Sequence, residues 1–500
     1  MRRLAAALLL LIAQPVFTQS PAARQILVIV VDGLRPDYVT PDLMPRLSRL
    51  GQRGIVFRAH HSVFPTVTRV NGSSFVTGSY PETHGLLGNT IYIPAVSATK
   101  TLDTGVREDL LAVERTGPLL TAPTLGEILE HAGKRLMVVS SGTSGSAYLL
   151  NHKASNGVIV HPQFTKPESL APRVVEKLGP VPPHALPNSA EHRRAVDAYI
   201  AFGLDELHPD VTLMWLSDPD STAHTKGIGG PPFRDALAAV DSEIGRTEDA
   251  LRARGLAERT DILVTSDHGF STHDSHLRLE TLVRPPDVVA EGAIYLRGDR
   301  TPARVAAVVA MLQEHSEVGA IFTRNGQVPG TLPYDSIRWN HPRSGDILVS
   351  ANWNTEKNEF GYAGKTTQTG VAGHGASSPY DIHNVLIAAG PDFRPGATSD
   401  APTGNVDIAP TVLHVLGIDA PPTMTGRAIL EAFRDGPAPA SIVVEQSSSV
   451  VMNRDRSYNL TAHFSAANGH RYLDYTEVTR SVPPRRALRD SRTDRPERRP

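Results

Sequence analysis

The chain has 500 residues, a formal net charge of −2 and no cysteine. Its 40% hydrophobic and 20% charged residues are typical of a globular protein that buries a large core. The near-neutral charge gives no indication of a nucleic-acid polymer or an anionic membrane as a partner. The lack of cysteine excludes disulfides, thiolate metal ligands and cysteine nucleophiles.

Residues 1–20 are predicted to be a signal peptide. Arg2 and Arg3 precede an apolar run, Leu4–Ala13, which is too short to cross a bilayer as a helix. The alternative is a buried N-terminal helix. The pattern favours export, so we expect a secreted or periplasmic protein with no membrane span after the signal is removed.

Several short runs rich in Val, Ile and Leu predict buried parallel strands, because they lack the alternation of a half-exposed strand. Apolar residues at helical spacing predict a helix over Arg234–Arg254. Strands that alternate with helices favour a three-layer α/β/α sandwich around a mostly parallel sheet. The predicted strands are Ile26–Val31, Leu136–Ser140, Val211–Ser217, Ile262–Ser266 and Val385–Ala389.

The pattern divides the chain into a catalytic domain over 24–435, a strand-rich extension over 441–483 and a disordered tail over 484–500, which is rich in Arg, Asp and Pro. Residues 280–370 are predicted to form an inserted α+β subdomain. Its expected elements are strands at Gly292–Arg297, Val318–Thr323 and Asp346–Ser350 and a helix at Pro302–His315. In the extension, strands are expected at Ser441–Glu445 and Arg471–Tyr475.

Asp32, Asp220 and Asp267 each follow a predicted strand. Open α/β sheets bind their ligands outside the carboxyl ends of the strands, so these carboxylates are expected to converge. Three Asp and three His suit two borderline metals such as zinc, and two-metal sites commonly transfer phosphoryl groups. The three histidines are His224, His268 and His374.

The spacing of these residues supports the metal hypothesis to different degrees. Asp220 and His224 are four residues apart, which on a helix places both side chains on one side; the alternative is a solvated loop with an Asp–His hydrogen bond. Asp267 and His268 are adjacent, so both reach one site only if the chain turns at Gly269. His374 lies between two glycines and fits a ligand on a loop, a weak signal alone.

Thr68 is the candidate nucleophile. A threonine hydroxyl needs a base or a metal to activate it, and a helix over Thr68–Thr77 would place this residue at a helix N-terminus, which favours anions. The alternative is a simple helix cap. Thr66, Ser73 and Ser74 are rival hydroxyls that local sequence does not exclude.

Asn89 offers an amide that could donate to a phosphoryl oxygen. It follows Gly88, and an Asn after Gly is common in turns, so the local sequence by itself favours a turn residue.

These segments together resemble the alkaline phosphatase superfamily, and within it the nucleotide pyrophosphatase/phosphodiesterase branch. The resemblance covers roughly residues 26–430. The matching segments include Val31-Asp32-Gly33, Phe64-Pro65-Thr66-Val67-Thr68, Asp220 to His224, Ser266-Asp267-His268-Gly269 and Gly373-His374-Gly375.

The resemblance implies that Thr68 attacks phosphorus to form a phosphothreonine, which water then hydrolyses, and that Asn89 holds a phosphoryl oxygen. It also implies two zinc ions. The ligands of one would be Asp220, His224 and His374, and those of the other Asp32, Asp267 and His268, with Thr68 bound beside them.

The chain departs from the branch after the nucleophile, where many members have Phe-Pro-Asn-His and this chain has Arg69-Val70-Asn71-Gly72. Related monoesterases carry Lys and Arg in a Ser-x-Lys-x-Arg-Gly segment, where this chain has Gly142 and Ser144. A monoester dianion needs more positive charge than a diester, so we expect a small phosphate diester or nucleotide-like substrate. The alternatives are a phosphomonoesterase, a phosphonate hydrolase, or an inactive metal-stabilised binding protein.

Overall fold

The computed structural model describes residues 24–275, 278–283 and 285–481. The expected signal peptide at 1–20 and the expected tail at 484–500 lie outside these residues. Within the described ranges, no helix combines the length and the apolarity that a membrane crossing requires.

The main sheet contains the five predicted strands. Its path is β20-β2-β19-β9-β1-β8-β5-β6-β7, and β21 also pairs with β2. The bounds are β1 (Gln25–Val31), β2 (Ile55–His61), β5 (Leu136–Ser140), β6 (Val158–His161), β7 (Phe164–Lys166), β8 (Val211–Leu216), β9 (Thr260–Thr265), β19 (His383–Ala389), β20 (Ala397–Ser399) and β21 (Thr403–Gly404).

Strands β9, β1, β8 and β5 run parallel, as predicted, and β6, which was not predicted, runs parallel to β5. The prediction for Val385–Ala389 was wrong in direction, because β19 pairs antiparallel with both β9 and β2. A strand buried on both faces is apolar throughout whichever way it runs, so composition does not reveal its direction. The reversal matters for the site, because β19 begins at the edge of the sheet where β9 ends.

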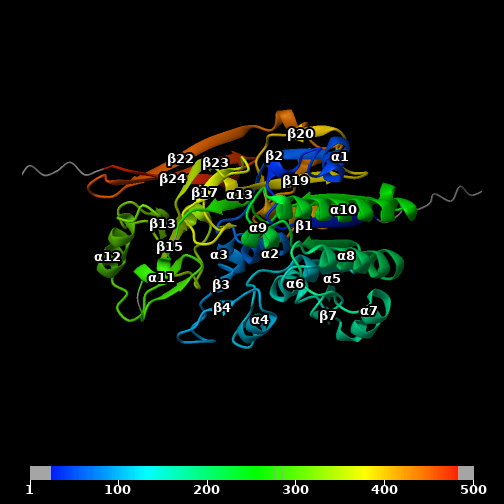
Figure 1. The fold of residues 1–500 in the computed structure, drawn as a ribbon, viewed down its shortest axis with the longest axis horizontal. Helices are drawn as coiled ribbons and strands as arrows, with labels where there is room; N and C mark the ends of the chain where they lie inside the picture. The colour runs from blue at the N-terminus through cyan, green and yellow to red at the C-terminus, as the bar shows by residue number, and fades with distance from the viewer. Residues whose placement is uncertain (1–23, 276–277, 284, 482–500) are drawn as a thin grey trace, which may run out of the picture.

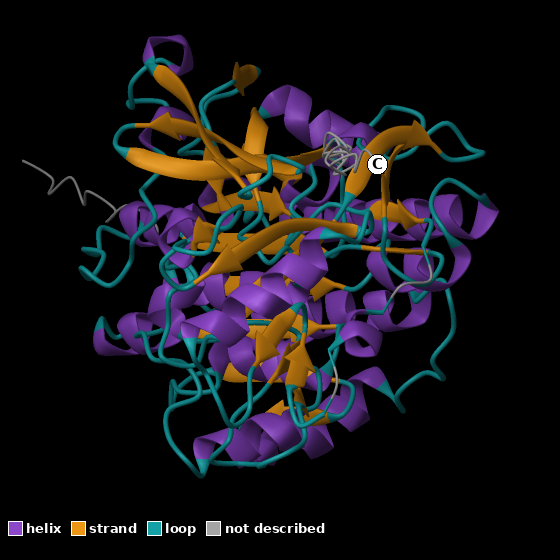
Figure 2. Ribbon diagram, turned by 90° about the vertical axis from the view of Figure 1, so that its left-hand side faces the viewer, coloured by secondary structure: helices purple, strands orange, loops and turns teal. Residues whose placement is uncertain are grey.

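Side chains of β1 alternate between two cores, which makes the architecture three-layered (Figure 2). Ile26, Val28 and Val30 pack with α2, α5, α6 and α14. Leu27 and Ile29 pack on the other face with α1, α8 and α10. The bounds are α1 (Pro45–Arg53), α2 (Thr68–Thr77), α5 (Leu125–His131), α6 (Ser144–Asn151), α8 (Ser189–Ala198), α10 (Pro231–Ala253) and α14 (Ile408–Val415).

The expected insertion contains a five-stranded sheet of order β11-β12-β15-β13-β14. Strands β12, β13 and β15 and helix α12 agree with the predicted ones to within a few residues, whereas β11 and β14 were not predicted. The bounds are β11 (Val288–Ala290), β12 (Ala293–Tyr295), α12 (Pro302–Gln313), β13 (Val318–Thr323), β14 (Leu332–Pro333) and β15 (Ile347–Ala351).

The last part of the 280–370 range belongs to another sheet. Here β16 (Trp353–Lys357) and β17 (Ala363–Thr366) join β10 (Ser271–His273) and β18 (Ala372–Gly373) in a four-stranded sheet. This sheet leads directly from β9 to the segment that carries His374.

The C-terminal extension forms a three-stranded antiparallel sheet, β22-β23-β24, beside the elements around α12 and β13 (Figure 1). The expected strand at Ser441–Glu445 was misplaced, because Pro439–Ser441 form a 3-10 turn and the strand begins three residues later. The bounds are β22 (Val444–Met452), β23 (Tyr458–Ala467) and β24 (His470–Arg480).

The remaining helices and strands are short connections. Their bounds are α3 (Pro81–His84), α4 (Arg107–Glu114), α7 (Ala171–Leu178), α9 (Asp220–Lys226), α11 (Leu279–Leu282), α13 (Pro379–Ile382), β3 (Thr90–Ile91) and β4 (Leu102–Asp103).

Candidate active site

Three carboxylates meet at one edge of the main sheet. Asp32 follows β1, Asp220 begins α9 just after β8, and Asp267 lies just after β9. Since β9, β1 and β8 are parallel neighbours, their carboxyl ends deliver all three side chains to the same place. The backbone N–H of Asp220 donates to the carbonyl of Asp32 at 3.1 Å, which holds two of these segments together.

Asp220, His224 and His374 form the first group of possible metal ligands. Asp220 Oδ2 lies 3.2 Å from His224 Nε2 and 3.4 Å from His374 Nε2. His224 is one helical turn after Asp220 on α9, which is the arrangement that the spacing predicts. His374 comes from the segment between β18 and β19, and a positive φ of +109° at Gly375 allows the chain to bend there.

Asp32, Asp267 and His268 form the second group, and all three are buried. His268 Nε2 lies 3.1 Å from Asp267 Oδ2 and 3.5 Å from Asp32 Oδ1. The chain bends at Asp267, two residues before the turn expected at Gly269, and this bend lets the adjacent side chains face one site. An added Cβ at Gly269 would lie 2.0 Å from the carbonyl oxygen of Tyr380, so only glycine fits this close backbone approach.

Each histidine is held so that Nε2 faces the carboxylates. His224 Nδ1 donates to the carbonyl of Ala372 at 3.1 Å, His268 Nδ1 to that of Gly269 at 2.9 Å, and His374 Nδ1 to that of Thr66 at 2.8 Å. With the proton on Nδ1, a neutral imidazole presents a lone pair at Nε2. A backbone acceptor behind a histidine is the usual way in which a metal-binding tautomer is fixed.

The carboxylates also keep oxygens free. Asp32 Oδ2 accepts from the indole of Trp215 at 2.9 Å and Asp267 Oδ1 from the N–H of Gly33 at 3.1 Å. Asp32 Oδ1, Asp220 Oδ2 and Asp267 Oδ2 are buried without a hydrogen-bond partner. Buried carboxylate oxygens are costly unless a cation or a donor compensates them, so the donor set fits two metal ions.

The pKa values indicate the same demand for positive charge. Burial, followed by the negative charges of Asp267 and Asp220, raises the pKa of Asp32 well above its usual value. Burial would also raise the pKa of Asp220, but His224 and His374 hold it below its usual range. Burial and the nearby His268 lower the pKa of His374 to about 4, which keeps this imidazole neutral.

Thr68 lies beside the second group. Its Oγ1 is 3.3 Å from His268 Nε2, and the residue is the first of α2. The helix cap is Val67, and no side chain caps this end. The alternative of a capping threonine is therefore wrong, and the hydroxyl is left facing the candidate metal ligands.

The rival hydroxyls are engaged elsewhere. Thr66 Oγ1 donates to the carbonyl of Ala376 at 2.8 Å, and Ser73 Oγ donates to the carbonyl of Arg69 at 2.8 Å. Ser74 Oγ lies 3.2 Å from His84 Nε2. Among these four hydroxyls, Thr68 is the one that the structure places beside the ligand atoms.

Asn89 is oriented by the residue that follows Thr68. Its Oδ1 accepts from the N–H of Arg69 at 3.0 Å, so the Nδ2 amino group is left to donate. This orientation is the one that a donor to a phosphoryl oxygen requires.

Asn89→Ala is expected to lower turnover about 10²–10³-fold, which is typical for loss of one oriented transition-state donor. Asn89→Asp keeps the acceptor for the Arg69 N–H but replaces the donor with a negatively charged oxygen, so a loss at least as large is expected in steady-state assays. If Asn89→Asp retains turnover within threefold, Asn89 acts only as a turn residue.

A cavity of about 590 Å³ opens onto Asp32, Thr68 and Asp220. Arg69 lines it and carries a buried Nε without a hydrogen-bond partner. Gly142 and Ser144 also line the cavity, and both are neutral. They stand where related monoesterases carry Lys and Arg. Among the described residues that line this cavity, Arg69 is the one arginine, and no cation stands at Gly142 or Ser144.

The sequence analysis missed the residues that hold the ligands in place. Trp215, at the middle of the main sheet, bonds to Asp32, and the Thr66 carbonyl orients His374. A tryptophan near the end of a buried strand is a weak sequence signal for the bond to Asp32, since a buried indole N–H usually has a partner. Nothing local indicates the bond that orients His374, because it depends on a backbone carbonyl 308 residues away in the chain.

Comparison with known proteins shows which family the chain resembles. The profile of the family described as type I phosphodiesterase/nucleotide pyrophosphatase matches residues 26–376. Ectonucleotide pyrophosphatase/phosphodiesterase family member 5 of Homo sapiens is 23% identical over 416 residues, which cover 81% of this chain and 77% of the relative. Bis(5'-adenosyl)-triphosphatase ENPP4 of Homo sapiens is 25% identical over 419 residues, 81% of each chain.

The fold also matches a solved structure. It is murine ectonucleotide pyrophosphatase/phosphodiesterase 5, an inactive threonine-to-alanine variant in complex with AMP. The TM-score is 0.61 at 18% identity, and the match covers 82% of this chain and 100% of that one. At this identity the likeness establishes the shared fold.

Proposed function

Because the chain belongs to the type I phosphodiesterase/nucleotide pyrophosphatase family, and is therefore a phosphoric-ester hydrolase, we propose that it cleaves small phosphate diesters or nucleotide-like pyrophosphates through a covalent intermediate on Thr68. The observation that carries this proposal is the position of Thr68 Oγ1, 3.3 Å from His268 Nε2 at the start of α2. The same hydroxyl borders the cavity onto which Asp32 and Asp220 open.

Two zinc ions are the proposed cofactors. Asp220, His224 and His374 would hold one, and Asp32, Asp267 and His268 the other, since these groups combine free carboxylate oxygens with oriented imidazoles. When bound, such ions supply positive charge that lowers the pKa of a nearby hydroxyl and stabilises phosphoryl oxygens.

The chain's own residues perform the two displacements. The Thr68 oxygen forms a bond to phosphorus as the bond from phosphorus to the leaving oxygen breaks. The Thr68 proton passes to water in the cavity, and the leaving group departs with the electron pair on its oxygen. Water then attacks the phosphothreonine, breaks the bond between phosphorus and Thr68, and restores the hydroxyl. The first N–H groups of α2 and the Asn89 amide favour the negative charge that develops on the phosphoryl oxygens.

Relatives support a nucleotide-like substrate. The solved murine relative holds AMP, and a human relative is named as a bis(5'-adenosyl)-triphosphatase. The cavity of about 590 Å³ has the size of a small-molecule site, so we propose a small nucleotide-like diester rather than a polymer. We also propose that the protein is exported, on the basis of the N-terminal sequence pattern.

Diesters are expected to be cleaved at least roughly tenfold faster than monoesters in kcat/KM, a difference of about 1.4 kcal/mol. The reason is charge, because Gly142 and Ser144 supply none for the extra oxygen of a dianion. Zinc-loaded protein is assayed with a nitrophenyl monoester, bis-nitrophenyl phosphate, a nucleotide nitrophenyl ester and a nitrophenyl phosphonate.

A faster monoester would contradict this preference and point to Arg69, which lines the cavity with an unpartnered Nε. Arg69→Ala then decides the matter: collapse of the monoester rate with the diester rate retained would show that Arg69 replaces the missing cations. Arg234→Ala is the control. Arg234 lies on the outer helix α10, where its Nε donates to the carbonyl of Gly229. No turnover with any of the four substrates would favour the inactive binding protein.

A further inference from the structure

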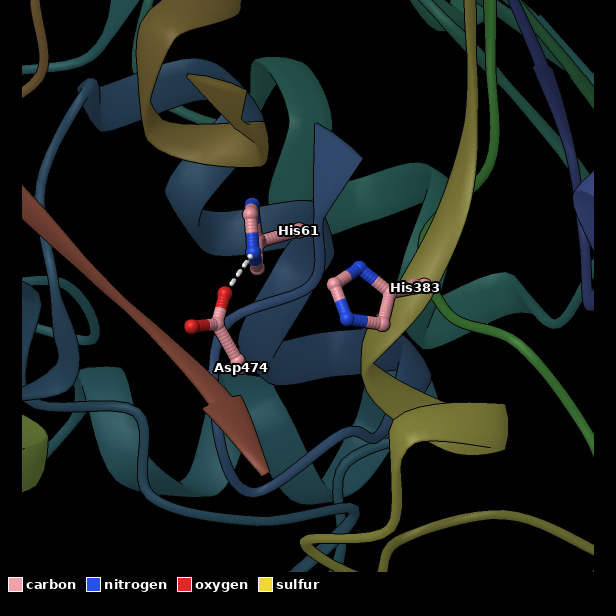
Figure 3. Close-up of side chains that lie close together, drawn as sticks. All are labelled: His61, His383 and Asp474. Carbon is pink, nitrogen blue, oxygen red and sulfur yellow. Dashed lines mark hydrogen bonds and ion pairs between the residues drawn. The ribbon is translucent and has the colours of Figure 1, made fainter. Parts of the chain in front are cut away.

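A third group of possible metal ligands lies outside the catalytic cavity. His61 ends β2, His383 begins β19, and Asp474 lies in β24 of the C-terminal sheet. Figure 3 shows the three side chains converging from these strands, with His61 hydrogen-bonded to Asp474 and His383 facing the pair. The ligand atoms of the group all lie within 4.8 Å of one another, the same limit that the two catalytic groups meet.

His61 has the orientation of a metal ligand. Its Nδ1 lies 2.8 Å from the carbonyl of Thr403 and donates to it, which leaves the Nε2 lone pair of the neutral ring pointing at Asp474 Oδ1, also 2.8 Å away. Two lone pairs at this distance repel unless a cation lies between them. That cation is either a proton on Nε2 or a metal ion.

His383 distinguishes these two possibilities. Its ring lies 4.7 Å from that of His61, centroid to centroid. One nitrogen of the His383 ring lies within 4.8 Å of the ligand atoms that His61 and Asp474 offer. A proton between His61 and Asp474 satisfies that pair alone, whereas a metal ion also uses the second imidazole.

Asp474 completes the group. Ser465 Oγ donates to Asp474 Oδ1 at 2.8 Å and fixes the side chain. The site is enclosed, since the side chains of His61 and Asp474 are 2% and 18% exposed.

We propose that His61, His383 and Asp474 bind a third metal ion, which fastens β24 of the C-terminal sheet to β2 and β19 of the main sheet. Two imidazoles and one carboxylate suit a divalent transition metal of borderline softness, such as zinc. The site is independent of the proposed catalytic chemistry, since none of its residues borders the cavity at Thr68.

The test is the zinc content per chain after incubation with zinc chloride and removal of free metal. His383→Gln keeps a polar side chain but loses the imidazole, and Asp474→Asn keeps the shape of the carboxylate. Each is expected to bind one equivalent less than the unmodified protein and to retain turnover. Each is also expected to unfold at a lower temperature in zinc, while the unfolding temperatures after chelation are more nearly equal.

His463→Gln is the matched control. His463 Nε2 lies 3.1 Å from Glu477 Oε1 in the same sheet, an imidazole–carboxylate pair with no second imidazole in the group. Its zinc content is expected to equal that of the unmodified protein.

The proposal is decided by the difference in zinc content between His383→Gln and the unmodified protein, and not by the total zinc content of either. Equal zinc contents would overturn it, and would show that His61 and Asp474 form an imidazolium–carboxylate pair. Failure of the catalytic metal sites would lower the totals of both proteins but leave the difference of one equivalent, so the two failures are distinguishable.

Discussion

Thr68→Ala is expected to lower turnover by roughly 10³-fold or more, as deletion of a nucleophile does in other hydrolases. The six carboxylate and imidazole ligands remain, so the metal content is expected to stay that of the unmodified protein. Thr68 Oγ1 lies 3.3 Å from His268 Nε2, and no other hydroxyl among Thr66, Ser73 and Ser74 is placed there. Steady-state assays with elemental analysis of the same sample measure both effects.

Two further variants sharpen this test. Ser73→Ala removes a hydroxyl from the same helix that bonds only to the Arg69 carbonyl, and it is expected to keep most of the turnover. Thr68→Ser restores a hydroxyl at the same position and is expected to recover part of the lost rate. Near-normal activity in Thr68→Ala would move the nucleophile to another residue.

Loss of the first ligand group is expected to have an effect of similar size. His224→Gln removes one of the two imidazoles beside Asp220. The other, that of His374, lies 3.4 Å from the Asp220 carboxylate. We expect the variant to lose one zinc equivalent and roughly 10³-fold or more in turnover, because charge on the phosphoryl group is no longer compensated. A chelator should abolish turnover of the unmodified protein, and added zinc should restore it.

The comparison with His383→Gln separates the catalytic metals from the third site. Both variants are expected to lose one equivalent, but His383→Gln should retain turnover because its site lies away from Thr68. A zinc ion that binds only the folded state stabilises it by about 2.7 kcal/mol when the free zinc concentration is 100 times the Kd of the site. A His224→Gln variant with full zinc content and full turnover would refute the proposed ligand set.

The fold was predictable where patterns are local. Apolar runs located β1, β5, β8 and β9, and parallel neighbours then placed Asp32, Asp220 and Asp267 at one edge. The direction of β19 was not predictable, because an apolar strand reads alike both ways. The strand over Ser441–Glu445 was misplaced by the turn at Pro439–Ser441.

The sequence predicted that the members of the candidate site lie together, but not the residues that support them. Spacing on α9 indicated that Asp220 and His224 share one side, whereas the chain bends at Asp267 and not at the expected Gly269. The hydrogen bonds that orient the ligands come from distant backbone carbonyls and from Trp215. Such contacts are made only by tertiary packing, and the same is true of the group at His61, whose members lie on three strands.

The most direct test of the central claim is the mass of the protein during turnover. A nucleotide nitrophenyl ester is mixed with zinc-loaded protein, and the reaction is quenched in acid within milliseconds. The protein is then digested, and the masses of its peptides are measured by mass spectrometry. The account predicts a nucleotidyl group on the peptide that carries Thr68, absent from Thr68→Ala. Full turnover with no modified peptide, or with the group on another residue, would contradict it.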